Sequence, residues 1–189
     1  YKVGTVKLAE EGIEEFSLDA WYLLEYVTGV SKAMYFAEPE RAVSEENADR
    51  YIDCIRQRAA HIPLQHITGE QEFMGYPFYV NEHVLIPRQD TETLVEEAIQ
   101  VMRPKMKILD MCTGSGCIVL SILKMCREKY YMTELQGIGA DVSEEALKVA
   151  RENGRRLEVP VTWIQSDLFA KIPEEEKYDV IVSNPPYIE

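Results

Sequence analysis

The sequence predicts an α/β protein, with a doubly wound parallel sheet in its second half and a small all-helical domain before it. After Lys105, short apolar segments alternate with helical segments, and this alternation is typical of a parallel sheet with right-handed crossovers. Residues 5–62 instead repeat apolar side chains at helical spacing. The pattern changes near residue 80, so we expect two domains of different architecture.

Length and charge limit the classes of function. At 189 residues the chain is long enough for one full domain or two small ones. Its 33 acidic and 20 basic residues give a net charge of −13, which makes duplex DNA a poor partner because DNA binding needs a basic face. No apolar run is long enough to cross a membrane, and residues 1–15 lack the pattern of a signal peptide. We therefore expect a soluble, cytoplasmic, acidic protein.

The cysteines and histidines do not have the spacing of a metal site. The four cysteines are Cys54, Cys112, Cys117 and Cys126, and they include no C-x-x-C pair. The three histidines are His61, His66 and His83, and the five-residue step between the first two does not align ligands on one helix face. We expect free buried thiols and no bound metal.

The helical region has recognisable starts and stops. Ser17 is a candidate N-cap, and Gly29 stands where the same helix would end. Ser44 opens a longer helix that carries an apolar stripe to Ala59. Three or four short helices would form a small bundle, too slight to carry chemistry in its own core. We expect it to serve substrate recognition or packing.

Between the two domains the pattern favours a β-hairpin. Residues 72–87 are rich in aromatic and β-branched side chains and are interrupted by Gly75-Tyr76-Pro77. A helix is expected to follow over residues 91–102. We place the helical domain at residues 1–71, the hairpin linker at 72–89 and the α/β domain at 90–189.

Every predicted strand of the α/β domain ends at a segment that could bind a ligand. The strands are expected at residues 106–111, 137–142, 161–165 and 178–183, with helices at 117–126 and 143–157. The carboxyl ends of parallel strands meet at one edge of the sheet, where open α/β sheets bind their ligands. The segments after the strands should therefore form one site.

The loop after the first strand, Cys112-Thr113-Gly114-Ser115-Gly116, is the first part of that site. Gly114 and Gly116 remove side chains where a ligand would approach backbone N–H groups at a helix N-terminus. NAD is the natural competitor, but its fingerprint requires a third glycine where Val119 stands. Hydride transfer is therefore disfavoured.

Two acidic residues at the next strand ends favour an adenosine site. Asp141 ends the second strand, where it could accept hydrogen bonds from two ribose hydroxyls. Asp167 follows the third strand and could accept from an exocyclic amine, while Leu168 and Phe169 supply apolar surface for a purine. The glycine loop together with both acids is more specific than the loop alone.

The segment Asn184-Pro185-Pro186-Tyr187 indicates the chemistry. The Asn184 side-chain oxygen and the Pro185 carbonyl could each accept one hydrogen from a planar NH2 group, and Tyr187 could lie against the conjugated plane behind it. Such a nitrogen is a poor nucleophile, and acceptors on both hydrogens raise its electron density and aim it at an electrophile. The alternative interpretation is a strand stopped by proline with asparagine in a turn.

These motifs resemble a known family. Asn184-Pro185-Pro186-Tyr187 and the tract Ile108 to Gly116 look like the S-adenosylmethionine-dependent amino-methyltransferases. The helical N-terminal domain and the tract Leu85-Ile86-Pro87-Arg88-Gln89-Asp90-Thr91-Glu92 narrow the resemblance. They are similar to the HemK/PrmC-type enzymes, which methylate the glutamine amide of the Gly-Gly-Gln motif in peptide chain release factors. Asn-Pro-Pro-Tyr alone is shared with enzymes that methylate adenine.

The resemblance implies a Rossmann-like methyltransferase fold and roles for individual residues. Residues 112–116 would form the cofactor loop, Asp141 would bind the ribose, and Leu168 would flank the adenine. Asn184, Pro185, Pro186 and Tyr187 would hold the glutamine amide, with Asn184 also near the cofactor. Two departures are Cys112, where glycine is common, and Gln89, where many relatives have proline.

The family's sheet has seven strands, whereas this chain stops just after the fourth, so we expect a protein truncated at its C-terminus. Three functions stay open: a release factor methyltransferase, a nucleic-acid adenine methyltransferase, and a non-catalytic module that binds the cofactor. The acidic charge argues against the second. We expect a monomer with S-adenosylmethionine as cofactor, release factors as partners, and neither DNA nor membrane binding.

Overall fold

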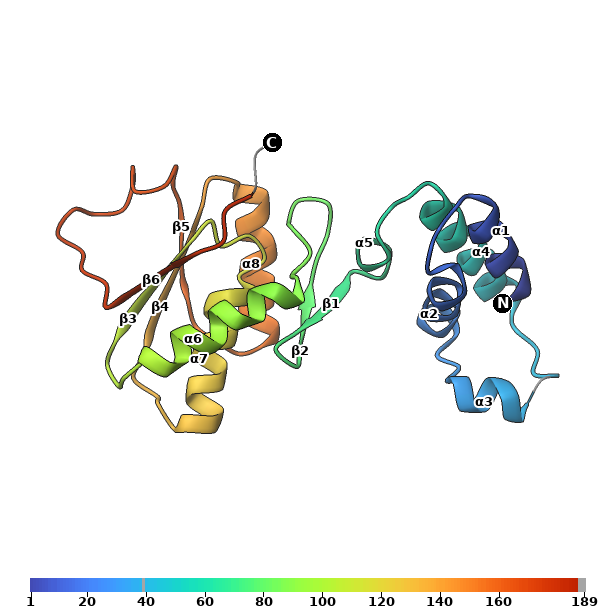
Figure 1. Ribbon diagram of the computed structural model, residues 1–189, viewed down its shortest axis with the longest axis horizontal. Coiled ribbons are helices and arrows are strands. Elements are labelled where there is room, and N and C mark those ends of the chain that lie inside the picture. The colour runs from blue at the N-terminus through green and yellow to red at the C-terminus, as the bar shows by residue number, and fades with distance from the viewer. Residues whose placement is uncertain (39, 187–189) are drawn as a thin grey trace. The chain divides into compact units, whose positions relative to one another are not determined.

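The computed structural model describes residues 1–38 and 40–186 (Figure 1). The chain divides into two compact units, Tyr1–Gly69 and Glu70–Glu189, and each is considered by itself. The division lies two residues before the boundary expected from the sequence, and the hairpin belongs to the second unit. Among the helices that the structure describes, none combines the length and the apolar character needed to span a membrane.

The first unit consists of helices, five in the described residues where three or four were expected. They are α1 (Lys2–Glu10), α2 (Phe16–Thr28), α3 (Lys32–Ala37), α4 (Glu45–Ala59) and α5 (Leu64–Thr68). Their core includes the fully buried side chains of Leu8, Leu23 and Ile55. Gly4 on α1 lets the Tyr51 side chain of α4 pack against the helix backbone, because a Cβ at position 4 would clash with the Tyr51 hydroxyl.

The predicted helix signals in this unit are partly right. Ser44 caps α4, with its Oγ accepting from the Asn47 N–H at 3.3 Å, and Gly29 ends α2 in the left-handed region at φ 66°. The expectation for Ser17 is wrong, because α2 begins at Phe16 and Glu15 holds the N-cap position. The Ser17 hydroxyl instead lies 2.7 Å from the Tyr1 hydroxyl.

The second unit opens with an antiparallel hairpin and one helix. Strands β1 (Glu70–Phe73) and β2 (Tyr76–Tyr79) pair from Glu70↔Tyr79 to Phe73↔Tyr76. The short 3-10 helix η1 (Gln89–Thr91) then leads into α6 (Glu92–Val101). The hairpin contributes Phe73 and Phe78 to the same buried cluster as α6, so it packs as part of this unit.

The remaining elements form the predicted parallel sheet. They are β3 (Lys107–Met111), α7 (Cys117–Tyr130), β4 (Gln136–Asp141), α8 (Glu144–Arg156), β5 (Thr162–Gln165) and β6 (Val180–Ser183). The strand order is β5-β4-β3-β6, and each neighbouring pair is parallel (Figure 1). This confirms the α/β fold class, and the order places β3 and β4 at the centre.

The two faces of the sheet have separate cores. On one face, α6 and α7 pack around Ile108 and Val182 in a cluster that continues to the hairpin. On the other face lie Leu109, Met111, Ile138 and Ala140, with Ile172 and Tyr178 packed against them. Side chains alternate along each strand, so Ile108 and Leu109 necessarily face opposite sides. The segment between β5 and β6 covers only part of the second face, where Ile181 of β6 is 52% exposed. The strand ends are left to form a site.

Candidate functional site

A cavity of about 570 Å³ lies where the strands of the second unit end. The predicted cofactor residues that line it are Cys112, Gly114, Asp141, Asp167 and Leu168. Asn184 and Pro186, which follow β6, line it as well. Four segments far apart in the sequence therefore meet at one edge of the sheet, as parallel topology requires.

Some predicted residues do not line the cavity. Thr113 and Ser115 are buried at 3% and 2% exposure, and neither they nor Gly116 face the cavity. Pro185 is exposed and is also not among the lining residues. Tyr187 lies outside the described residues.

The glycine loop after β3 has an unusual backbone. Cys112, Gly114 and Gly116 all have φ in the left-handed region, at 60°, 55° and 78°. A Cβ on Gly114 would meet nothing within 4 Å, so its backbone is open toward the cavity. At Gly116 glycine is required for packing, because a Cβ there would lie 2.9 Å from a Trp163 ring carbon. Gly114 thus fits close approach of a ligand, whereas Gly116 fits close packing at the start of α7.

Asp141 holds the loop in place as well as facing the cavity. Its Oδ2 accepts from the Gly114 N–H at 2.9 Å, and its Oδ1 accepts from the Ser143 N–H at 2.9 Å. An ionised carboxylate has about four acceptor positions, so each oxygen can accept one more hydrogen bond. The carboxylate therefore braces both neighbouring segments and can still bind a diol.

Asp110 is a further acidic residue that sequence reasoning did not assign. It lies on β3, is fully buried, and its Oδ2 accepts from the Thr113 hydroxyl at 2.6 Å and the Val119 N–H at 3.3 Å. Its Oδ1 has no hydrogen-bond partner among the described residues. Burial raises the pKa of Asp110 to about 7, and the negative charge of Asp141 contributes in the same direction. An acid inside an otherwise apolar strand was the signal for it.

The segment after β5 forms another wall. Ser166 is buried, its hydroxyl donates to the Leu168 carbonyl at 2.7 Å, and its Oγ accepts from the Lys171 N–H at 2.9 Å. This turn holds Leu168 at φ 46° with 55% of its surface exposed at the cavity. Phe169 is 57% exposed and does not line the cavity. The structure thus offers Leu168, and not Phe169, as apolar surface.

Asn184 follows β6 and lies half-buried at the cavity. Its Nδ2 donates to the Thr91 hydroxyl oxygen at 3.2 Å. The preceding residue, Ser183, donates from its hydroxyl to the Met111 carbonyl at 2.8 Å, which ties the end of β6 to the end of β3. The Asn184 side chain is therefore held by Thr91, and the backbone before it is held by the bond from Ser183.

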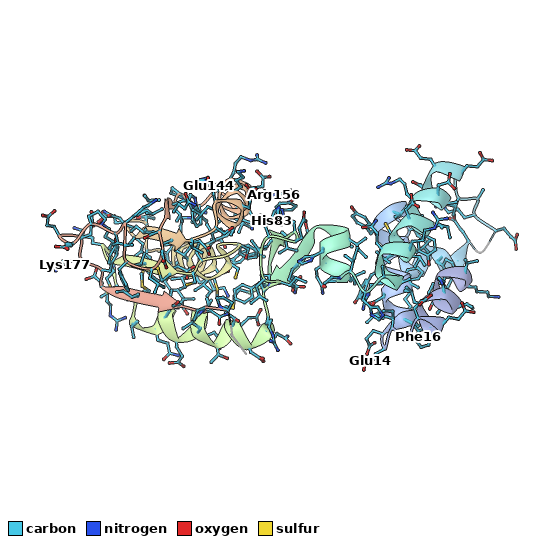
Figure 2. The ribbon with its side chains drawn as sticks, turned by 90° about the horizontal axis from the view of Figure 1, so that it is seen from above. Glu14, Phe16, His83, Glu144, Arg156 and Lys177 are labelled. Carbon is cyan, nitrogen blue, oxygen red and sulfur yellow. The ribbon has the colours of Figure 1, made fainter. Side chains whose placement is uncertain are left out.

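The loop after β2 also lines the cavity, which sequence reasoning missed. His83, Val84 and Leu85 come from this loop, and Val84 packs against Ala146 and Val149 of α8. In Figure 2, His83 is labelled on the same side of the second unit as Glu144, the first residue of α8. No local pattern marks this loop, because its place depends on how the hairpin packs against α8.

The charge of the cavity favours a cation. Asp141 and Asp167 line it, and the lining residues that the structure describes include neither lysine nor arginine. Burial raises the pKa of the Cys112 thiol at the loop, so this group stays protonated and uncharged near neutral pH. A cationic ligand with a ribose and a purine would match the carboxylates, the bare backbone at Gly114 and the apolar Leu168.

Comparison of the sequence with known protein families agrees with this geometry. Residues 89–189 match the family model "Methyltransferase small domain", and residues 1–69 match "PrmC N-terminal domain". Proteins named "Release factor glutamine methyltransferase" are similar to the chain. The one from Leptospira interrogans is 37% identical, covering 96% of this chain and 63% of its own length. The one from Streptococcus pneumoniae is 42% identical, covering 81% and 52%.

A solved structure supports the fold. The Thermus thermophilus 16S rRNA N2 G1207 methyltransferase (RsmC), in complex with AdoMet and guanosine, is similar with a TM-score of 0.52 and 20% identity. The match covers 63% of this chain and 32% of that one. This chain spans 51–63% of the length of the curated relatives named "Release factor glutamine methyltransferase" that it matches.

The methyltransferase model covers more than half of the chain and includes the ends of β3 to β6, where the cavity lies. Residues 1–69 match the PrmC N-terminal domain model, and the protein belongs to the methyltransferase small domain family.

Proposed function

We propose that this protein transfers a methyl group from S-adenosylmethionine to the side-chain amide nitrogen of the glutamine in the Gly-Gly-Gln motif of peptide chain release factors. The observation that carries the proposal is the shared cavity: Asn184 lines the same space as Asp141 and Gly114. A group that could bind an amide thus lies beside groups that could bind a nucleoside. The names of the relatives at 35–42% identity support the same substrate.

The residues present fit S-adenosylmethionine. Its sulfonium is positive, and the carboxylates of the cavity provide the matching charge. Asp141 would hold the ribose hydroxyls, Asp167 and Leu168 would lie at the adenine, and the backbone of the Cys112–Gly116 loop would pass close to the cofactor at Gly114. When bound, the cofactor supplies a methyl group on a positively charged sulfur.

The protein's own part in the reaction is to position the substrate amide. The nitrogen of a glutamine side chain is a poor nucleophile because its lone pair is delocalised into the carbonyl. Asn184 Oδ1 and the Pro185 carbonyl would accept its two hydrogens and point the nitrogen at the methyl group. The nitrogen would form the new N–C bond as the bond between the methyl group and the sulfur breaks, with the electron pair staying on the sulfur, and it would lose one proton to solvent. Pro186 and Tyr187 would complete the amide site.

The helical domain would recognise the release factor. We assign residues 1–71 to this role, 72–89 to the linker and 90–189 to catalysis. An exposed stripe on α2 supports the assignment: Leu18, Tyr22 and Tyr26 follow one another at helical spacing and are 42–47% exposed. Aromatic residues are enriched at the centres of protein interfaces. We further infer a cytoplasmic monomer that binds neither membranes nor DNA, and the net charge of −13 supports the absence of DNA binding.

A methyl-transfer assay tests the proposal. The protein, expressed as its own gene encodes it, would be incubated with S-adenosylmethionine that carries a labelled methyl group. Its three substrates would be a release factor, the same factor with the Gly-Gly-Gln glutamine changed to alanine, and double-stranded DNA. We expect label only in the unmodified release factor, on the glutamine amide. Label in DNA adenine, or in the alanine variant at an equal rate, would contradict the proposal.

A further inference from the structure

Thr91 uses its hydroxyl in an unexpected way. It ends η1 and holds the N-cap position of α6, where a threonine side chain ordinarily accepts a hydrogen bond from the first turn of the helix. Here it makes no such cap hydrogen bond. Its Oγ1 accepts instead from Nδ2 of Asn184 at 3.2 Å, across 93 positions of sequence. A group suited to capping a helix is therefore directed at the candidate catalytic side chain.

The position of that hydroxyl is well defined by its neighbours. The Thr91 N–H donates to the Arg88 carbonyl at 3.0 Å, which closes the turn of η1. The next residue, Glu92, accepts from the Met74 N–H at 2.7 Å, which ties the start of α6 to the hairpin turn. The helix then buries Val95 in the core. Backbone, hairpin and core thus fix where the hydroxyl lies.

The contact matters because a carboxamide has two different ends. Asn184 presents two N–H donors at Nδ2 and an acceptor at Oδ1, and a half-turn of the side chain exchanges them. In the proposed reaction the substrate amide offers two N–H donors of its own. If Nδ2 faced the substrate amide, two N–H donors would point at each other. If Oδ1 faces it, Oδ1 accepts a hydrogen bond from the substrate N–H. The rate of transfer therefore depends on which end of Asn184 faces the substrate.

We infer that Thr91 is a positioning residue that holds Nδ2 of Asn184, so that Oδ1 faces the substrate amide. The inference rests on the proposed function for its role in the rate. The link between the two side chains stands on the structure alone. The sequence singles out the tract Arg88 to Glu92 but assigns it no chemical role. In this inference the tract carries Thr91, the residue that orients the amide acceptor.

Three variants separate positioning from packing. Thr91→Val keeps the shape and removes the hydroxyl, Thr91→Ser keeps the hydroxyl, and Thr93→Val makes the same change at an exposed threonine of α6. Each protein, as its gene encodes it, would be compared in single-turnover methylation of a release factor with saturating S-adenosylmethionine. Calorimetry would measure the cofactor Kd.

We expect Thr91→Val to slow the transfer by about 3- to 10-fold, the effect of one neutral hydrogen bond. The cofactor Kd should stay within about twofold, because Thr91 does not line the cavity. Thr91→Ser should recover most of the rate, and Thr93→Val should match the wild type. A wild-type rate for Thr91→Val, an equal loss in Thr91→Ser, or a loss explained by weaker cofactor binding would overturn the inference.

A second readout does not depend on activity. The side-chain NH2 of Asn184 gives a pair of resonances in the ¹H–¹⁵N spectrum, assigned by their loss in Asn184→Ala. Thr91→Val should shift them and Thr91→Ser should leave them nearly unchanged. If the wild-type protein transfers no methyl group to the release factor, the proposed function fails, and these spectra still decide the contact. Unshifted resonances in Thr91→Val would overturn it.

Discussion

Asp110 is expected to make the second unit less stable as the pH rises toward 7. Its pKa is raised from 3.8 to about 7 by complete burial. Between these values the folded state binds a proton that the unfolded state has lost, so stability falls as pH rises. The stabilisation is fully present below about pH 4 and is lost by the time the pH has passed 7. At 1.36 kcal/mol per pKa unit, the loss is about 4 kcal/mol.

Asp110→Asn tests this reasoning. Asparagine cannot ionise, and its carbonyl can still accept from the Thr113 hydroxyl as Oδ2 does now. We expect the variant to lose most of the pH dependence and to exceed the wild type in stability above pH 7. The effect would be largest, up to about 4 kcal/mol, at pH 8.

The assay is urea unfolding from pH 4.5 to 8.5, followed by fluorescence. The chain has two tryptophans, Trp21 in the first unit and Trp163 in the second, so a Trp21→Phe background reports the second unit alone. Asp90→Asn is the matched control, because the Asp90 side chain is 90% exposed. Parallel curves for the Asp110→Asn variant and its parent across the whole range would refute the reasoning.

Two further predictions concern the cofactor and the helical domain. Asp141→Ala should weaken binding of S-adenosylmethionine, measured by calorimetry, through the loss of two charge-assisted hydrogen bonds of about 1.5–3 kcal/mol each. It should also loosen the Gly114 and Ser143 N–H groups that Asp141 holds, and an unchanged cofactor Kd would remove it from the site. Deletion of residues 1–69 should raise the KM for the release factor and leave the cofactor Kd nearly unchanged, because every residue that lines the cavity lies in the second unit. Normal kinetics after the deletion would rule out a recognition role.

The strand ends could be predicted because they depend on local pattern. Apolar runs bounded by polar or glycine residues placed the strands within a residue or two of β3 to β6. Parallel topology then brought Asp141 and Asn184 to one edge, and both line the cavity. The first unit was less regular. Ser17 has the type of an N-cap residue, but Glu15 holds the N-cap position two residues earlier, and the Ser17 hydroxyl contacts the Tyr1 hydroxyl instead.

The parts that could not be predicted depend on contacts distant in sequence. The hydrogen bond from Asn184 to Thr91 joins segments that no local rule connects. The wall formed by His83 to Leu85 arises only when the hairpin packs on α8. Gly116 was predicted to leave room for a ligand, but the structure shows that its bare Cα leaves room for the Trp163 ring. Asp110 is visible in the sequence as an acid in an apolar strand, but its burial depends on α7 packing over its face of the sheet, where the Val119 N–H donates to it.

In the proposed reaction, Asn184 orients the substrate amide by accepting one of its hydrogens. The most direct test of this role is single-turnover methylation of a release factor by the Asn184→Ala variant, at saturating S-adenosylmethionine. Loss of one of two preorganised acceptors should slow the transfer by about 10²–10³-fold. Because the proposed mechanism uses no side chain as a base, the wild-type rate should also change little between about pH 8 and 9, above the pKa of Asp110. A near-normal rate for Asn184→Ala, or a steep rise of the wild-type rate in that range, would contradict the claim.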